Sequence, residues 1–123
     1  MSERPLVAVV DDNDSVRESL PDLLQQAGLS VLAFSSAEAF LDAGADETTR
    51  CLVLDVGLPG MSGPELHQEL LRRGKRIPVV FITAQSDQSI QPRLLAAGAV
   101  ACLFKPFTDT ALIEAVEAGL GVR

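Results

Sequence analysis

The sequence predicts an α/β fold in which a doubly wound parallel sheet carries helices on both faces. Two patterns support this prediction. The first is a set of five short apolar runs, at residues 6–10, 29–34, 51–54, 78–83 and 101–104. The second is a helical pattern after each run, so that strands and helices alternate along the chain. Such alternation produces parallel strands with right-handed crossovers, and the length of 123 residues fits a single domain.

The apolar runs differ in how continuous they are. Most are nearly unbroken stretches of Val, Leu and Ile, such as PVVFIT at 78–83. Strands that are buried on both faces have this composition. The run at 29–34 reads LSVLAF and is the most mixed. We therefore expect the second strand to lie at an edge of the sheet.

Helix boundaries follow from residues that favour helix ends. A capping side chain is expected at Asp14 for the first helix and at Ser35 or Ser36 for the second, and Pro64 fits the first position of the third helix. Glycine favours the residue just after a helix. The predicted helices run from Asp14 to about Gly28, onward from Ser36, from Gly63 to Gly74, up to Gly98, and from Thr108 to about Gly119.

Two prolines fall within predicted helices. Proline lacks the N–H of a helical hydrogen bond, and its ring clashes with the preceding turn. Pro92 therefore predicts that the fourth helix either begins near this residue or is kinked. Pro21 raises the same question for the first helix.

Composition excludes several kinds of function. With 17 acidic and 10 basic residues the net charge is −7, which argues against nucleic-acid binding by this domain and against binding to an anionic membrane. One histidine, His67, and two cysteines without CxxC spacing do not make a zinc site. Polar residues follow His67 in the sequence, so an exposed side chain is expected there.

The chain also lacks targeting and membrane-spanning signals. No apolar stretch reaches the 18 residues that suggest a transmembrane helix, and no signal peptide is recognisable. A cytoplasmic location is expected, with Cys51 and Cys102 as small buried thiols. Residues 1–123 are expected to form one domain, with no effector domain in this chain.

Polar residues stand at the carboxyl ends of four predicted strands. These ends share one edge of a parallel sheet, where ligands of such folds bind. Neighbouring carboxylates repel each other unless a cation shares the site, and oxygen ligands favour Mg²⁺. An aspartate in such a site is suited to accept a phosphoryl group. The residues that converge are Asp11 and Asp12 after the first strand, Asp55 after the third, Thr83 after the fourth and Lys105 after the fifth.

The sequence resembles the receiver domain of bacterial two-component response regulators over nearly its whole length. The matching segments are VVDDN at 9–13, LDVGLPGMSG at 54–63, FITA at 81–84, AGA at 97–99 and KPF at 105–107. The segments LPGMSG and SAEAFL look most like the nitrogen-fixation regulator subfamily, whose effector is a helix-turn-helix DNA-binding domain. The resemblance implies a flavodoxin-like sheet with strand order 2-1-3-4-5.

The resemblance also implies roles for the residues at the strand ends. Asp55 would accept a phosphoryl group from the phosphohistidine of a sensor histidine kinase. The domain would be a signalling phosphoacceptor and not an enzyme, although it would catalyse this transfer and the slow hydrolysis of its own aspartyl phosphate. Thr83 and Lys105 would contact the phosphoryl group, and Lys105 would be joined to Pro106 by a cis peptide bond. Mg²⁺ would be bound by Asp12, Asp55 and the backbone carbonyl of Gly57, with Asp11 acting through water.

The sequence departs from the family at the position three residues before the conserved lysine. Receiver domains usually carry a rotating Tyr or Phe there, but this chain has Cys102. The nearest aromatic residue, Phe104, is expected to point to the other face of the strand. Phosphorylation is expected to change the surface that binds a partner. The resemblance implies that this surface is the face formed by the fourth helix, fifth strand and fifth helix, and that it contacts an effector domain or forms a homodimer. The alternative is a receiver that does not switch and acts as a phosphate sink or a constitutive interaction module.

Two rival functions are less compatible with the residues. A phosphatase of the haloacid dehalogenase type also uses a strand-end aspartate with Mg²⁺, but it needs a second Asp two residues later. Gly57 stands two residues after Asp55, and Asn13 stands two residues after Asp11. A receiver-like binding module that never takes phosphate is expected to lose one of the acidic residues or the lysine, and this chain retains them all.

Overall fold

The computed structural model describes residues 4–84 and 89–121 and contains the predicted parallel sheet of five strands in the order β2-β1-β3-β4-β5. All neighbouring strands are parallel. The run at 29–34 forms an edge strand, as its mixed composition predicted. The strands are β1 (Leu6–Val10), β2 (Ser30–Phe34), β3 (Cys51–Asp55), β4 (Val79–Ala84) and β5 (Ala101–Lys105).

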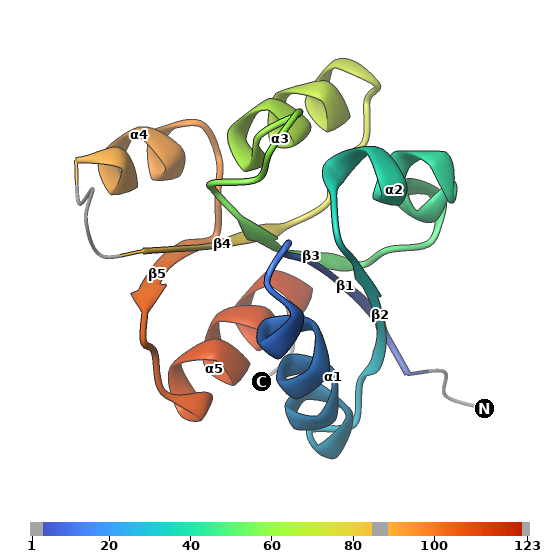
Figure 1. The fold of residues 1–123 in the computed structure, drawn as a ribbon, viewed down its shortest axis with the longest axis vertical. Coiled ribbons are helices and arrows are strands. Elements are labelled where there is room, and N and C mark those ends of the chain that lie inside the picture. Colours follow the sequence, from blue (N-terminus) through green and yellow to red (C-terminus); the bar gives the residue numbers. More distant parts are fainter. Residues whose placement is uncertain (1–3, 85–88, 122–123) are drawn as a thin grey trace.

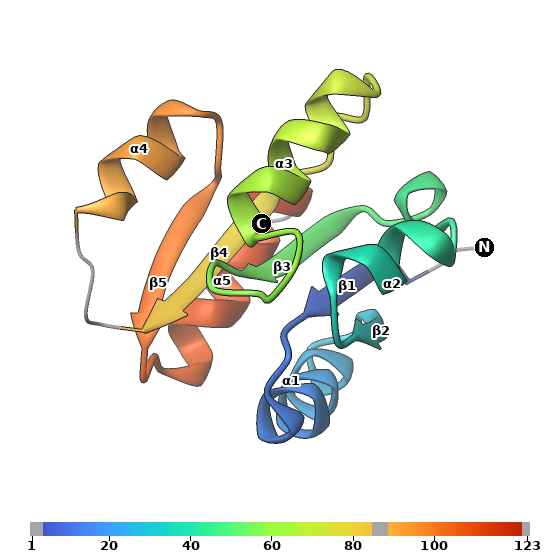
Figure 2. The same ribbon diagram turned by 45° about the horizontal axis from the view of Figure 1, so that its top comes forward.

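Helices cover both faces of the sheet (Figure 1). One face carries α2, α3 and α4, and the opposite face carries α1 and α5, as Figure 2 shows from a second direction. None of the described helices has the length and hydropathy that crossing a lipid bilayer requires. The helical segments are α1 (Asp14–Gln26), α2 (Ala37–Asp42), the 3₁₀ turn η1 (Ala45–Glu47), α3 (Gly63–Arg72), α4 (Ile90–Ala96) and α5 (Asp109–Leu120).

Two apolar clusters, one on each face of the sheet, hold the layers together. Alternate residues of the central strands face opposite layers, because side chains of a strand alternate in direction. Val10 and Leu54 pack with Phe40 and Leu66 of the α2 and α3 layer. Val9 and Val53 pack with the α1 and α5 layer, whose buried residues include Leu20, Leu24, Leu112 and Val116. Because the side chains of the central strands pack into an apolar cluster on each face of the sheet, both the odd and the even positions of these strands are apolar. This explains the nearly continuous apolar runs in the sequence.

Helix ends differ from the predictions in several details. The N-cap of α1 is Asn13 and not the predicted Asp14. The side chain of Asn13 accepts hydrogen bonds from Ser15 N and Val16 N. Ser36 caps α2, one of the two predicted positions. The N-cap of α3 is Ser62, which makes Pro64 the second helical residue.

The later boundaries also shift. Helix α5 continues through Gly119 to Leu120, and the next residue, the C-cap Gly121, adopts a left-handed conformation. Pro92 is the third residue of α4, where a missing N–H costs little because the first turn has no partner for it. The helix therefore begins near Pro92, one of the two predicted outcomes. Pro21 lies within α1, and the helix continues past it.

The turn between β3 and α3 is tight around one glycine. Gly63 N donates a hydrogen bond to Val56 O at 3.2 Å, which brings the start of α3 against the end of β3. A Cβ atom placed on Gly63 would lie 2.2 Å from the backbone oxygen of Asp55. Only a residue without a side chain fits this approach, so the glycine fixes where α3 starts relative to Asp55.

The substitution Gly63→Ala tests this close approach. Replacing glycine by alanine in a helix ordinarily stabilises a protein by about 0.5–1 kcal/mol. Here the added methyl group overlaps the Asp55 carbonyl, so we expect the free energy of unfolding to fall by about 2 kcal/mol in urea denaturation. Gly57→Ala is the matched control, because its Cβ would have its nearest contact at 3.9 Å. Equal stability of the two variants would contradict the steric argument.

Candidate functional site

Three carboxylates meet at the edge of the sheet where the parallel strands end. Asp11 and Asp12 directly follow β1, and Asp55 is the last residue of β3, the neighbouring strand. One oxygen from each carboxylate lies within 4.8 Å of the other two. Asp11 and Asp55 are buried, whereas Asp12 is exposed. The structure thus brings together the three acidic residues that the sequence placed at this edge.

Lys105 bridges two of these carboxylates. Its Nζ atom lies 3.1 Å from Asp11 Oδ2 and 3.2 Å from Asp55 Oδ1, and it donates a hydrogen bond to each. The lysine ends β5, which is separated from β3 by β4, so its long side chain reaches across one strand. The peptide bond between Lys105 and Pro106 is cis, as the family resemblance implied.

The turn after β1 is held by Asn13 and Arg17, to which the sequence had assigned no role at the site. Asp11 Oδ1 accepts a hydrogen bond of 2.8 Å from Asn13 N, and Asp11 O accepts one of 3.0 Å from Arg17 Nη1. Arg17 is also paired with Asp14. An Asn that precedes an acidic first turn is a recognisable capping signal. The sequence does not indicate the hydrogen bond from Arg17 to Asp11 O, because it forms only when α1 is placed beside the end of β1.

The electrostatic balance of the site is acidic. Burial raises the pKa of Asp55, and the charge of Asp11 raises it further, while Lys105 acts in the opposite direction. Burial by itself would lower the pKa of Lys105, but its hydrogen bonds and attraction to Asp11 and Asp55 outweigh this effect and raise the pKa. Lys105 is therefore charged at neutral pH, and its single positive charge does not balance three carboxylates.

Gly57 lies beside this cluster, and Thr83 lies on β4 one residue beyond Ile82, the register partner of Asp55. Thr83 is the fifth of the six residues of β4 and is buried, and it pairs in register with Phe104 of β5. Gly57 follows Asp55 in the β3–α3 loop, and a Cβ at Gly57 would lie 3.9 Å from Asp55 Oδ2. The backbone at Gly57 is therefore close to the Asp55 carboxylate.

The donor atoms fit a hard divalent cation. Carboxylate oxygens are the ligands that Mg²⁺ prefers, and Mg²⁺ keeps several waters when few protein ligands are present. The exposed Asp12 leaves one side of the cluster open to solvent. Excess negative charge and an open side are the properties that binding of such an ion requires.

The position expected to carry a rotating aromatic residue is filled differently. Cys102 is buried in the cluster that faces α3 and α4, and Phe104 packs against the same cluster. The prediction that Phe104 points to the other face is wrong, because residues two apart in a strand share a face. Gln91 Nε2 of α4 donates a hydrogen bond of 3.1 Å to Cys102 O. Helix α4 is thereby linked to the backbone of β5.

His67 is also placed differently from the expectation. Its side chain is buried, with its ring centroid 5.7 Å from that of Phe81. Burial lowers the pKa of His67. Leu66, His67 and Leu70 share the inward side of α3, so His67 is part of the packing between this helix and the sheet.

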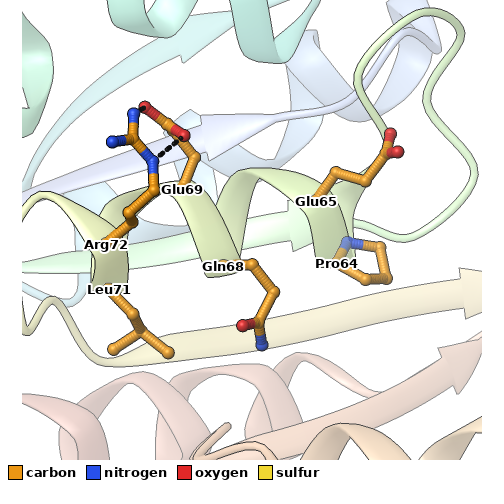
Figure 3. A pocket seen from close by; sticks show the side chains of 6 residues that line it. All are labelled: Pro64, Glu65, Gln68, Glu69, Leu71 and Arg72. Atoms are coloured by element: carbon orange, nitrogen blue, oxygen red, sulfur yellow. Dashed lines mark hydrogen bonds and ion pairs between the residues drawn. The ribbon is translucent and has the colours of Figure 1, made fainter.

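A hollow of about 680 Å³ runs along the outer side of α3 (Figure 3) and is separate from the carboxylate cluster. Glu69 and Arg72 form an ion pair in its wall. Its lining includes none of the residues at the strand ends, and no chemistry is suggested by it. The residues that line it are Pro64, Glu65, Gln68, Glu69, Leu71 and Arg72.

The raised pKa of Asp55 predicts how its charge affects stability without metal. An unfolded aspartate ionises near pH 3.9, whereas the folded chain keeps the Asp55 proton to a higher pH. The free energy of unfolding therefore falls as the pH rises from the unfolded pKa through the folded pKa. In EDTA, we expect Asp55→Asn to unfold at higher urea concentration than the wild type at pH 7. The difference should vanish below the ordinary aspartate pKa.

The exposed Asp22→Asn in α1 provides the control for removing an acidic charge. A lower stability of Asp55→Asn than of the wild type at pH 7 would show that the Lys105 ion pair outweighs burial and repulsion.

Comparisons with known proteins show which family the chain is similar to. A family model for the response regulator receiver domain matches residues 7–117. The transcriptional regulatory protein FixJ of Azorhizobium caulinodans is 46% identical over 121 residues, and nodulation protein W of Bradyrhizobium diazoefficiens is 44% identical over 117 residues. The matches cover 98% and 95% of this chain but 57% and 52% of those proteins, so the chain spans about half the length of the curated relatives it matches.

Solved structures show the same fold. The response regulator StyR superposes with a TM-score of 0.89 at 47% identity, over 97% of this chain and 60% of that one. The FixJ fragment named FixJ-N superposes with a TM-score of 0.86 at 38% identity, over 98% of this chain and 96% of that one. The chain therefore belongs to the response regulator receiver domain family, with relatives that are consistent with the nitrogen-fixation regulator subfamily.

Proposed function

We propose that this domain accepts a phosphoryl group on Asp55 and thereby carries a signal from a sensor histidine kinase. The observation that carries the proposal is the Asp55 carboxylate itself, which ends the central strand, contacts Lys105 at 3.2 Å and shares its site with two further carboxylates. The family assignment supports the same role.

The proposed transfer uses groups that already lie together. An oxygen of Asp55 attacks the phosphorus of the donor phosphohistidine, a P–O bond forms, and the P–N bond breaks with its electron pair remaining on the imidazole nitrogen. The Lys105 ammonium, which contacts Asp55 Oδ1, pairs with the negative charge of the transferred group. The Thr83 hydroxyl at the adjacent strand end donates a hydrogen bond to a phosphoryl oxygen.

Mg²⁺ is part of this proposal. Asp12, Asp55 and the carbonyl of Gly57 would hold the ion, with Asp11 acting through a water molecule. When bound, the ion neutralises negative charge on the oxygens of the transferring group. The short distances between the three carboxylates and their uncompensated charge support this assignment.

The proposed partners follow from the family. A sensor histidine kinase supplies the phosphoryl group, and an effector domain or a second receiver contacts the face formed by α4, β5 and α5. Leu95 of α4 is 42% exposed, and Val100 before β5 is 36% exposed, which provides apolar surface for such a contact. We place this exchange in the cytoplasm, in keeping with two free, buried cysteines.

Chemical phosphorylation tests the acceptor and the metal ligand separately. With acetyl phosphate and Mg²⁺, we expect intact mass measurement to show one added phosphoryl group on the wild type and none on Asp55→Asn. Asp12→Ala should remain folded, since Asp12 is exposed, but it should lose Mg²⁺ affinity by about tenfold or more and should be labelled more slowly. The exposed Asp22→Asn serves as control. Equal labelling of Asp55→Asn would assign the phosphoryl group to another residue.

A second candidate function, a receiver that does not switch, is favoured by one observation. The small Cys102 occupies the place of the rotating aromatic residue. In the switching version, Thr83 moves toward the phosphoryl group, α4 changes its position on the sheet, and the hydrogen bond from Gln91 to Cys102 O breaks. In the version without a switch, the domain is a phosphate sink or a constitutive partner surface.

NMR with beryllofluoride and Mg²⁺ separates these two versions. For the switching version, we expect the side-chain amide signals of Gln91 and the backbone signals of α4 to shift on activation, while Cys102 moves little. For the alternative, changes stay near Asp55. The signals of Leu24, which is buried in the opposite apolar cluster, provide an internal control. A large rearrangement centred on Cys102 would contradict both versions.

A further inference from the structure

A side chain of α2 holds the loop that follows the proposed acceptor. Glu38 Oε2 accepts a hydrogen bond of 2.8 Å from Met61 N, across 23 residues of sequence. The loop begins after Asp55 and ends at Ser62, the N-cap of α3. Glu38 belongs to the second helical segment and is not among the residues at the strand ends. Its contact is therefore a separate attachment of the acceptor loop to the rest of the domain.

The ends of this loop are fixed by other hydrogen bonds. Val56 N donates to Ile82 O at 3.0 Å, and Ser62 N donates to Glu65 Oε1 at 2.8 Å. Between them, within the described part of the chain, the bond from Met61 to Glu38 is the one hydrogen bond that ties residues 57–61 to a different helix or strand. This middle part includes Gly57, whose carbonyl is the proposed backbone ligand of Mg²⁺.

The shape of the loop is adapted to the Glu38 carboxylate. Gly60 has a φ of +72°, in the left-handed region that favours glycine. A Cβ at Gly60 would lie 2.7 Å from Glu38 Oε2. The absence of a side chain at residue 60 leaves room for the Glu38 carboxylate to reach Met61 N. The shape of the loop at Gly60 thus fits the position of the Glu38 side chain.

The charge of Glu38 strengthens the contact. The hydrogen bond from Met61 N lowers the pKa of Glu38, so the group is ionised at neutral pH. A hydrogen bond to an ionised acceptor is stronger than one between neutral groups. The carboxylate is also near the N-terminus of α2, where negative charge is favourable.

We propose that Glu38 is a positioning residue for phosphoryl acceptance, holding the loop so that the Gly57 carbonyl and the Asp55 carboxylate keep their relative places. This inference rests on the proposed function. Residues that support a metal ligand from outside the site affect affinity and rate without touching the reacting atoms. Glu38 would act in this way through the backbone of Met61.

Three variants of α2 test the inference. Glu38→Ala removes the acceptor of the Met61 hydrogen bond. Glu38→Gln removes the charge but keeps an oxygen that can accept the same hydrogen bond. Asp42→Ala removes an exposed acidic side chain from the other end of the helix, so it controls for the loss of charge and for general effects on α2.

Two measurements separate the contact from its consequence. In apo protein, we expect the Met61 amide to exchange with solvent about tenfold faster in Glu38→Ala, as loss of a charge-assisted hydrogen bond implies. With acetyl phosphate and Mg²⁺, the initial rate of labelling and the Mg²⁺ affinity should both fall by about tenfold in this variant. Glu38→Gln, which keeps an acceptor without the charge, should recover part of each loss, and Asp42→Ala should match the wild type.

Each failure has a distinct signature. Unchanged Met61 exchange in Glu38→Ala overturns the inference whether or not Asp55 accepts phosphate. Faster exchange with unchanged labelling and Mg²⁺ affinity shows that Glu38 is only structural and also overturns it. A wild-type protein that takes no label overturns the proposed function, and the inference with it.

Discussion

The Lys105 ammonium between Asp11 and Asp55 is the interaction on which the site depends. Two buried carboxylates side by side are costly unless a cation pairs with them. Lys105 supplies this charge at 3.1 and 3.2 Å, and it can do so because β5 ends at the same edge of the sheet as β1 and β3. The third carboxylate, Asp12, leaves the cluster with excess negative charge. The fold thus builds a site that is stable enough to form and still acidic enough to attract a divalent cation.

Much of this arrangement could be predicted from the sequence. Buried parallel strands have continuous apolar runs, and their carboxyl ends share an edge, so the meeting of Asp11, Asp12, Asp55 and Lys105 at that edge followed from the parallel arrangement of the strands. The sheet order came from the resemblance of the motifs to receiver domains, and the structure confirms it. The chemical roles of these residues stay proposals, since the cluster of side chains identifies a place for chemistry and not the reaction itself.

The rest depended on contacts that local patterns do not reveal. Glu38 and Met61 are 23 residues apart, and nothing in either neighbourhood indicates their hydrogen bond. His67 is followed by polar residues, yet helical periodicity places it beside Leu66 and Leu70 on the inward side of α3. The face of Phe104 was a different kind of error, because the period of a strand places it with Cys102. Capping at Asn13 competed with an equally suitable Asp14 one residue later.

The tight turn at Gly63 also makes the two sides of the site unequal in stiffness. The first residue of α3 lies against the backbone oxygen of Asp55. A shift of the Asp55 backbone therefore pushes on the start of α3, and the packing of the buried residues of this helix opposes the shift. Helix α4 has seven residues and one buried side chain, Leu94, too short to be stable without its packing. If Asp55 accepts a phosphoryl group as proposed, we therefore expect a shift of its backbone to displace α4, with its one buried side chain, more than α3, which buries four residues.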